Sequence, residues 1–567
     1  MAADPPRFDL SAPVEALHSN ERVKYDSRQL RGTLTASLDD AATGAVDETD
    51  ALLTKFFGIY QQDDRDLREE RRRARLEPRY QFMVRVRLPG GMCRPEQWLA
   101  LDALAREYAD GTLRLTTRQT FQFHGIRKRN VRSLIQGLRD AGLDTIAACG
   151  DDNRNVVCAA NPLLSGAHAD VGALAQRIGA HLLPRTGAYR EVFLEEPPTE
   201  PLPEPEEPLY GATYLPRKFK IALAVPPRND VDVYAHDLGF VALVEGGDIV
   251  GYNVLAGGGM GMTHNKPETF PRLADPVGVC RPDDVIAVAE HAMCIQRDFG
   301  DRRDRAHARF KYTIEDRGVA WFRAELERRL GRALAEPRTV RFDTSADARG
   351  WTQGPDGRWH YTLFVENGRV TDRPDARLQS GLRAIAAVHR GVFALTTNQN
   401  VIIAGIAARE RSGMAALLQQ HGLLNTERPS ALHQGALACV SLPTCGLAMA
   451  ESERYLPSLL DKLQLLLAEC GLTDEPISVR MSGCPNGCSR PYLAEIALVG
   501  KAPGKYNLYL GASRSGERLN ALYRETLGEA QILESLRPLL ERFSAERNAG
   551  ESFGDFVVRA RIHHAAT

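Results

Sequence analysis

The sequence feature that most constrains the fold of this chain is an internal repeat with a period of about 280 residues. The segment Leu115-Thr116-Thr117-Arg118-Gln119 recurs as Leu395-Thr396-Thr397-Asn398-Gln399, and Gly125-Ile126 and Gly142-Leu143 recur as Gly405-Ile406 and Gly422-Leu423. Upstream of these matches, Pro95 and Pro374 each begin an expected helix, over 95–109 and 374–390. Because the matches keep their order and a near-constant offset, the sequence predicts a duplicated architecture with a pseudo-twofold axis.

Each copy reads as strand, helix, strand and helix, which predicts an α+β fold with mixed sheets. In the first copy, residues 80–88 alternate between apolar and polar side chains, as in a strand with one buried face. We divide the chain into an N-terminal arm, a paired repeat domain and two further domains, over 1–78, 79–147 with 350–426, 148–349 and 427–567. The arm ends in a charge run over 65–79, expected to form a solvated helix, and the acidic, proline-rich stretch over 195–208 is expected to be an exposed loop.

Length and composition exclude several classes of protein. The 567 residues suggest about three or four domains, and 72 Lys+Arg against 73 Asp+Glu argue against a dedicated nucleic-acid binder. No apolar run is long enough for a membrane span, and the acidic N-terminus, broken by prolines, does not resemble a secretory signal. Ten cysteines are too few for a disulfide scaffold in a chain of this size. We therefore expect a soluble cytoplasmic enzyme.

Four of the cysteines form two closely spaced pairs, Cys439 with Cys445 and Cys484 with Cys488. Structural zinc sites usually have two to four residues between paired ligands, whereas the first pair here has five. An iron–sulfur cube is wider and accepts thiolates from more separated backbone positions. The spacing favours an iron–sulfur cluster and leaves a zinc site or coincidental thiols as alternatives, while the other six cysteines are expected to be buried thiols.

The first copy carries a polar face that the second copy lacks. If residues 114–124 are extended, alternate side chains on one face are all polar and partly cationic. They are Arg114, Thr116, Arg118, Thr120, Gln122 and His124. The second copy has Ala394, Asn398 and Ala404 in place of the three cationic or imidazole side chains. This asymmetry indicates a site for a polyanionic ligand such as a multi-carboxylate macrocycle, with an exposed strand face as the alternative.

A second group of cations surrounds the start of an expected strand after Pro216. Lys218 and Lys220 are two residues apart and so share a face of that strand. Together with Arg85 and Arg154 they could enclose a small oxyanion and stabilise its charge during a reaction. The glycine-rich segment 257–261 lacks the pattern of a nucleotide-binding loop, and we expect it to let the backbone approach a flat cofactor.

With these residues in hand, the chain resembles the sulfite and nitrite reductase family over nearly its whole length. The resemblance is carried by the paired cysteines, by residues 118–125 and by Thr213-Tyr214-Leu215-Pro216-Arg217-Lys218-Phe219-Lys220. It continues at both ends, in Asn20-Glu21-Arg22, in Leu30-Arg31-Gly32-Thr33 and in Phe553-Gly554-Asp555-Phe556.

The resemblance implies a ferredoxin-like repeat domain, two α+β domains that bind sirohaem, and two coupled cofactors. A 4Fe–4S cluster would be held by Cys439, Cys445, Cys484 and Cys488, and Cys488 would also be the axial thiolate of the sirohaem iron. Arg85, Arg154, Lys218 and Lys220 would line the distal face. The sirohaem periphery would be held by Arg114, Thr116, Arg118, Gln122, His124 and Asn486.

The resemblance also implies the reaction and the electron donor. It implies six-electron reduction of sulfite to sulfide in assimilatory sulfur metabolism and cysteine biosynthesis. The chain has no flavin or NADPH module of its own, so a partner flavoprotein subunit, or a ferredoxin as the alternative, would supply electrons, with residues 1–78 as the expected docking element. Nitrite reduction on the same centres is the second enzyme hypothesis, and Lys220, where nitrite reductases of the family tend to carry Asn, favours sulfite. A zinc-binding scaffold protein is the hypothesis from another class.

Overall fold

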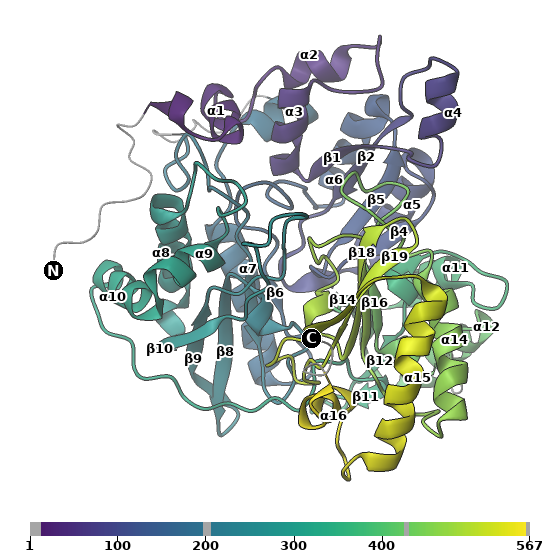
Figure 1. The fold of residues 1–567 in the computed structure, drawn as a ribbon. Coiled ribbons are helices and arrows are strands. Elements are labelled where there is room, and N and C mark those ends of the chain that lie inside the picture. The colour runs from purple at the N-terminus through teal and green to yellow at the C-terminus, as the bar shows by residue number, and fades with distance from the viewer. Residues whose placement is uncertain (1–12, 197–205, 425–429, 563–567) are drawn as a thin grey trace.

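The computed structural model describes residues 13–196, 206–424 and 430–562. In these residues the strands form four five-stranded sheets. Figure 1 shows the N-terminal helices above the rest of the molecule, with two α+β units lying on either side below them. Every described helix is too short or too polar to cross a bilayer. The prediction of an exposed loop over 195–208 falls largely outside the described residues, as does the expected domain joint near 427.

The two repeats form two sheets that exchange an edge strand. The first sheet contains β1 (Ile59–Asp63), β2 (Tyr80–Arg85), β5 (Phe121–Ile126), β4 (Leu113–Leu115) and β13 (Arg369–Val370). The second contains β11 (Gly350–Gln353), β12 (Trp359–Leu363), β15 (Val401–Ile406), β14 (Val392–Leu395) and β3 (Met92–Cys93). Since β13 comes from the second copy and β3 from the first, each copy completes the sheet of the other. The predicted duplication and its pseudo-twofold arrangement are confirmed.

The helices of the repeats pack against each other as well as on their own sheets. They are α5 (Pro95–Tyr108) and α6 (Val131–Asp140) in the first copy, and α11 (Leu378–Val388) and α12 (Arg411–Gln420) in the second. Arg383 of α11 forms an ion pair with the buried Asp102 of α5 at 2.6 Å. The helix predicted from Pro374 starts four residues later, because residues 372–377 form a bridged turn whose Asp372 accepts a hydrogen bond from Ser380 N–H at 2.9 Å.

The central and C-terminal units share one sheet pattern, in which three parallel strands are followed by two antiparallel ones. The central sheet has β6 (Val157–Cys158), β7 (Ile221–Ala224), β8 (Leu238–Glu245), β9 (Asp248–Ala256) and β10 (Asp275–Cys280). The C-terminal sheet has β16 (Ala436–Ala438), β17 (Val479–Ser482), β18 (Ile496–Ala502), β19 (Lys505–Leu510) and β20 (Ala521–Leu527). Their helices are α7 (Gly166–His181), α8 (Val285–Phe299), α9 (Phe310–Arg317) and α10 (Val319–Leu330), and α13 (Ala431–Gln434), α14 (Leu456–Glu469), α15 (Glu529–Glu546) and α16 (Phe553–Arg559). The predicted α+β class is confirmed.

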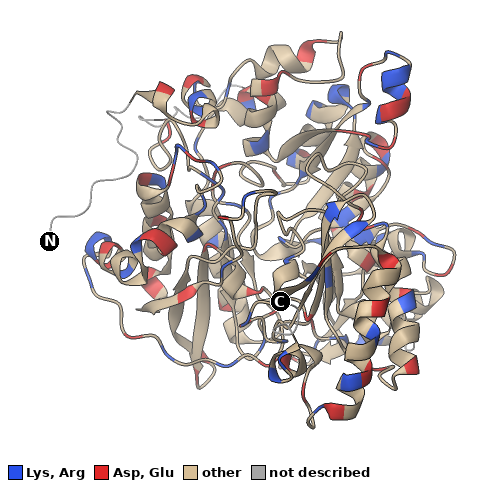
Figure 2. Cartoon of the chain, in the orientation of Figure 1, with Lys and Arg blue, Asp and Glu red and all other residues tan. Residues whose placement is uncertain are grey.

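The N-terminal segment folds onto the first repeat. It contains α1 (Ser19–Asp26), α2 (Leu34–Asp39), α3 (Glu48–Leu53) and α4 (Arg68–Arg73). Because β1 pairs with β2, the expected boundary at residue 78 separates neighbouring strands of one sheet. The charge run forms only the short α4, which is exposed and carries arginines and glutamates (Figure 2), and Arg75 beyond it has a left-handed backbone. The helix expected over 65–79 is therefore shorter than predicted.

Candidate functional site

The paired cysteines follow two neighbouring parallel strands. Cys439 comes directly after β16, and Cys484 comes two residues after the end of β17. Because β16 and β17 are parallel, their carboxyl ends lie at the same edge of the sheet, which is where ligands of such sheets bind. Gly483 N–H lies 3.3 Å from Cys439 Sγ, and Asn486 Nδ2 lies 3.6 Å from Cys484 Sγ, so both thiols already receive donors. The fold thus brings the two pairs to one place.

The electrostatics of the four sulfurs indicate a shared centre. Burial and then the neighbouring Cys488 raise the pKa of Cys439 and of Cys484 to about 12. The pKa of Cys445 is also raised, first by burial and then by Cys488. Three thiols whose ionisation is disfavoured in this way call for a cationic inorganic partner, since metal binding deprotonates a coordinating thiol.

The thiols are nevertheless not arranged around a single ion. No three of the described His, Cys, Asp and Glu side chains are placed to hold one metal ion. A tetrahedral zinc site needs four ligands converging on one point at about 2.3 Å, whereas an iron–sulfur cube takes one thiolate on each of its separate irons. The donor set therefore fits a cube better than zinc.

Residues 114–124 are not one extended strand as expected, because the chain turns between β4 and β5, which pair antiparallel with Arg114 opposite Gln122. The predicted polar side chains lie on this hairpin, mostly buried, and several of them hold unpaired polar atoms. Among the described residues, neither ring nitrogen of His124 has a hydrogen-bond partner, and the same is true of Gln122 Oε1 and of Arg118 Nε and Nη1. Burial, followed by neighbouring arginines, holds the pKa of His124 well below its usual range and lowers that of Arg118 to about 9. Buried polar atoms without partners are rare in native folds and call for a ligand. This face fits the carboxylate-rich periphery of a sirohaem.

Several members of the predicted face already form hydrogen bonds within the protein, among them Arg118 Nη2 and Thr120 Oγ1, which donate to the carbonyls of Asn155 and Val86. Arg114 Nε pairs with Glu453 at 2.8 Å, and Arg114 Nη2 donates to the carbonyl of Ala438 at 2.9 Å, directly before Cys439. Thr116 Oγ1 accepts a hydrogen bond from Arg118 N–H at 3.1 Å, although its oxygen can still donate. The structure therefore directs Arg114 toward the cysteine loop, and its contact with a cofactor stays a prediction.

The four predicted distal cations gather at the same place. Burial holds the pKa of Lys218 well below its usual range, and Arg217, Lys220, Arg309 and Arg154 lower it further. The pKa of Lys220 is lowered by burial and then by Arg309 and Arg118, while Asp237 and Cys488 act in the opposite direction. No described carboxylate forms an ion pair with either ammonium group. Two half-buried lysines without an ion pair are prepared to receive an anion.

Arg85, the last residue of β2, and Arg154, in the loop before β6, complete this group. Arg85 Nη1 lies 3.0 Å from Cys149 Sγ, and its Nε has no partner among the described residues. Arg154 Nε donates to the carbonyl of Gly150 at 2.9 Å and lies 3.7 Å from Asp152. Both arginines therefore keep N–H groups that could be offered to a bound ligand.

The glycine-rich segment 257–261 lies against the second cysteine loop. Met262 N–H donates to the carbonyl of Pro485 at 2.9 Å, and a Cβ on Gly261 would come within 3.3 Å of Asn486 O. At Gly258 a Cβ would lie 2.2 Å from the carbonyl of Tyr234, so no larger residue fits there. The segment therefore approaches the protein's own cysteine loop, and its approach to a flat cofactor stays a prediction.

Arg309 is a cation of the site that sequence reasoning missed. It is buried beside Asp237, its Nη2 lying 3.2 Å from Asp237 Oδ1, while its Nε has no partner in the described part of the chain. Arg309 directly precedes α9, so no strand-like alternation in the sequence marked it.

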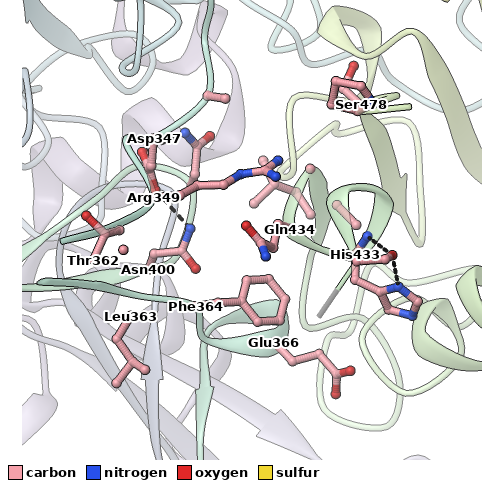
Figure 3. A pocket seen from close by; sticks show the side chains of 18 of the residues that line it. Asp347, Arg349, Thr362, Leu363, Phe364, Glu366, Asn400, His433, Gln434 and Ser478 are labelled. Carbon is pink, nitrogen blue, oxygen red and sulfur yellow. Dashed lines mark hydrogen bonds between the residues drawn. The ribbon is translucent and has the colours of Figure 1, made fainter. Parts of the chain in front are cut away.

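A cavity of about 1150 Å³ lies at the pseudosymmetric position rather than at these residues. It opens between the second repeat and the C-terminal unit, and the side chains of Asp347, Asn400 and Gln434 point into the region drawn in Figure 3. Thr396 Oγ1 donates to Asp347 at 2.7 Å, and the amides of Asn398 and Asn400 donate to it at 2.9 and 2.8 Å. The cavity is lined by side chains of both charges, and the chemistry-bearing cysteines and lysines are not among its lining residues.

Two family models match the chain. The nitrite/sulfite reductase ferredoxin-like half domain matches residues 74–141 and 352–421, which are the two repeats. The nitrite and sulphite reductase 4Fe-4S domain matches residues 173–334, a range that ends before the paired cysteines.

Similar proteins match over almost the whole chain. The "Sulfite reductase [NADPH] hemoprotein beta-component" of Nitrobacter winogradskyi is 56% identical over 552 residues, covering 97% of this chain and 96% of that protein. The protein of the same description from Chromohalobacter salexigens is 58% identical over 554 residues, with the same coverage of 97% and 96%. The solved structure of Mycobacterium tuberculosis NirA protein superposes with a TM-score of 0.77 at 24% identity, covering 97% of both chains, which is a likeness of fold.

Proposed function

Because the chain belongs to the nitrite and sulfite reductase family, we propose that it catalyses the six-electron reduction of sulfite to sulfide. The reaction takes place at a sirohaem coupled through a cysteine thiolate to a 4Fe–4S cluster, and its product serves cysteine biosynthesis. The observation that carries the proposal is the meeting of two cysteine pairs at one sheet edge with buried, unpaired cations.

The residues fit the two cofactors in distinct ways. Cys439, Cys445, Cys484 and Cys488 would hold the cluster, and Cys488 would also ligate the sirohaem iron. The sirohaem periphery would be held by Arg114, Thr116, Arg118, Gln122, His124 and Asn486. When bound, these cofactors would relay electrons from the donor and supply the metal that activates the sulfur–oxygen bonds. The buried polar atoms without hydrogen-bond partners on this face support the proposal that it binds the sirohaem periphery.

The distal cations bind the substrate and supply protons. Conversion of hydrogensulfite to hydrosulfide consumes six electrons and six protons and releases three waters. Arg85 and Arg154 keep their charge at any accessible pH and so orient the anion. Burial lowers the pKa values of Lys218 and Lys220, so their ammonium groups release a proton to a departing oxygen more readily than an exposed lysine does. An anion bound between them raises those pKa values, which couples substrate binding to proton uptake.

We place the electron donor outside the chain. A flavoprotein subunit of an NADPH-dependent sulfite reductase is the proposed partner, with a ferredoxin as the alternative, and residues 1–78 are the proposed docking element. The proposed compartment is the cytoplasm, where reducing conditions keep cysteines available as thiolates for a cluster.

The test is an absorption spectrum followed by a substrate comparison. Protein produced with sirohaem synthesis should show a haem Soret band and contain four cluster irons and one sirohaem iron per chain. With reduced methyl viologen as donor, kcat/KM for sulfite should exceed that for nitrite. A colourless protein that contains zinc refutes the proposal, and a preference for nitrite identifies the nitrite-reducing branch instead.

A further inference from the structure

Cys488 lies two residues before a buried arginine, Arg490, whose side chain is 6% exposed. Building on the proposed function, we propose that Arg490 and Thr117 are positioning residues for Cys488, fixing this shared thiolate at the axis that relates the two repeats. The distances and burial that follow carry this inference.

The guanidinium of Arg490 contacts the same backbone position in both repeats. Its Nη1 donates to the carbonyl of Thr117 at 3.2 Å, and its Nη2 donates to the carbonyl of Thr397 at 3.1 Å. Thr117 and Thr397 are equivalent residues of the duplicated motif. The planar guanidinium of Arg490 therefore bridges the two copies, a geometry that a lysine ammonium does not reproduce.

The guanidinium of Arg490 forms an ion pair with a buried carboxylate. Arg490 Nε lies 2.5 Å from Asp232 Oδ2, and Arg480 Nη1 lies 2.7 Å from the same oxygen. All three side chains are nearly inaccessible to water. Buried charges are stable only when they are paired, so the guanidinium has little freedom to move away from the axis.

The two equivalent threonine hydroxyls have different partners. Thr117 Oγ1 donates to the carbonyl of Cys488 at 3.2 Å, whereas Thr397 Oγ1 donates to the carbonyl of Asp230 and accepts a hydrogen bond from Arg490 Nη2 at 3.4 Å. The first repeat therefore forms a hydrogen bond with the cysteine itself, and the second forms one with the loop that carries Asp232. The chain thus supplies two hydroxyls in matching surroundings, of which one reaches the proposed thiolate ligand.

These contacts matter because Cys488 would join two metal centres. Groups outside the direct ligands orient those ligands, and their removal typically reduces metal affinity or activity about 10- to 100-fold. A cysteine held through its carbonyl and through the residue two positions later has little freedom to move its backbone relative to either metal. Loss of that hold should change the electronic coupling before it changes the fold.

The test compares Thr117→Val with Thr397→Val in full-length protein loaded with both cofactors, and adds Arg490→Lys. The readouts are the sirohaem content, the haem midpoint potential and the haem–cluster exchange coupling in low-temperature EPR and Mössbauer spectra. Thr117→Val and Arg490→Lys should shift the potential and weaken the coupling or lower the sirohaem content several-fold. Thr397→Val removes the longer contact of Arg490 Nη2, at 3.4 Å, but keeps its 3.1 Å hydrogen bond to the Thr397 carbonyl, so this variant should keep the wild-type spectra.

The outcomes separate this inference from the function on which it rests. Equal spectra for the two valine variants overturn the inference, whether both match the wild type or both are shifted. If Arg490→Lys does not accumulate as folded protein, the valine pair decides. Wild-type protein without sirohaem and cluster overturns the proposed function, and this inference with it.

Discussion

Replacement of Lys218 by methionine tests whether the distal cations bind the substrate. The side chain keeps its length and apolar stem but loses its charge, so the packing around residues 216–220 changes little. Since no described carboxylate pairs with the lysine, removing the ammonium leaves no unpaired buried anion behind. The loss should therefore appear in sulfite reduction and not in folding or in cofactor content.

The magnitude follows from Coulomb's law. A unit charge about 4 Å from the anion is worth about 4 kcal/mol at an effective dielectric constant of about 20. The lysine is half-buried, and the remaining cations tighten around the anion, so about 2–4 kcal/mol should be lost. This corresponds to a fall in kcat/KM for sulfite of about 30- to 1000-fold. Steady-state assays with reduced methyl viologen measure it independently of the natural partner.

Arg217, one residue earlier, provides the matched control. It lies 3.8 Å from Asp151, so its charge is already partly compensated. Arg217→Gln should lower kcat/KM less than about threefold at neutral pH. If Arg217→Gln lowers kcat/KM for sulfite as much as Lys218→Met does, the loss reflects the net charge of the region, and the assigned role of Lys218 is refuted.

Three further predictions concern pH, the cluster and stability. Burial and then Arg217 lower the pKa of Lys218, so kcat/KM for sulfite should fall as pH rises through that pKa. Arg217→Gln should move this alkaline limb of the pH–rate profile to higher pH. An unchanged limb contradicts the role assigned to Lys218. Cys445→Ser should lose most of the cluster iron, measured by iron and sulfide analysis, and retention of four irons would exclude it as a ligand. Asp102→Ala removes the 2.6 Å ion pair between α5 and α11 and should lower the free energy of unfolding by about 2–3 kcal/mol. Urea titration measures the free energy of unfolding of both variants. Glu96→Ala, in an exposed ion pair, should lower it by less than about 1 kcal/mol, and equal losses for the two variants would contradict the argument.

The parts of the fold that sequence predicts best are those encoded by local patterns. The duplicated motif around Thr117 and the two cysteine pairs lie in short segments whose residues are themselves the signal. The exchanged edge strands could not be predicted in this way, because β3 and β13 have two residues each and carry no periodicity. Their pairing is decided by the partner strands, which come from the other copy.

The site residues that sequence reasoning missed depend on contacts that are distant in sequence. Arg490 gains its place from Thr117 and Thr397, which lie 373 and 93 residues away. Arg114 could be identified as part of a polar face, but its ion pair with Glu453 depends on a segment 339 residues later. A side chain's position on a strand can be read locally, whereas the partner that it meets is set by the tertiary fold.

The second repeat differs from the first in the charges on which the proposed site for an anionic macrocycle depends. At the position equivalent to the polar face, Thr396, Asn398 and Asn400 all donate hydrogen bonds to the carboxylate of Asp347. The chain itself thus supplies the anion that the first repeat leaves to a ligand, and burial raises the pKa of this carboxyl. An added carboxylate ligand would face this one across a low-dielectric cavity and would find Ala394 and Asn398 where the first repeat has arginines. Duplication supplied the framework twice, and the charges decide which copy can bind.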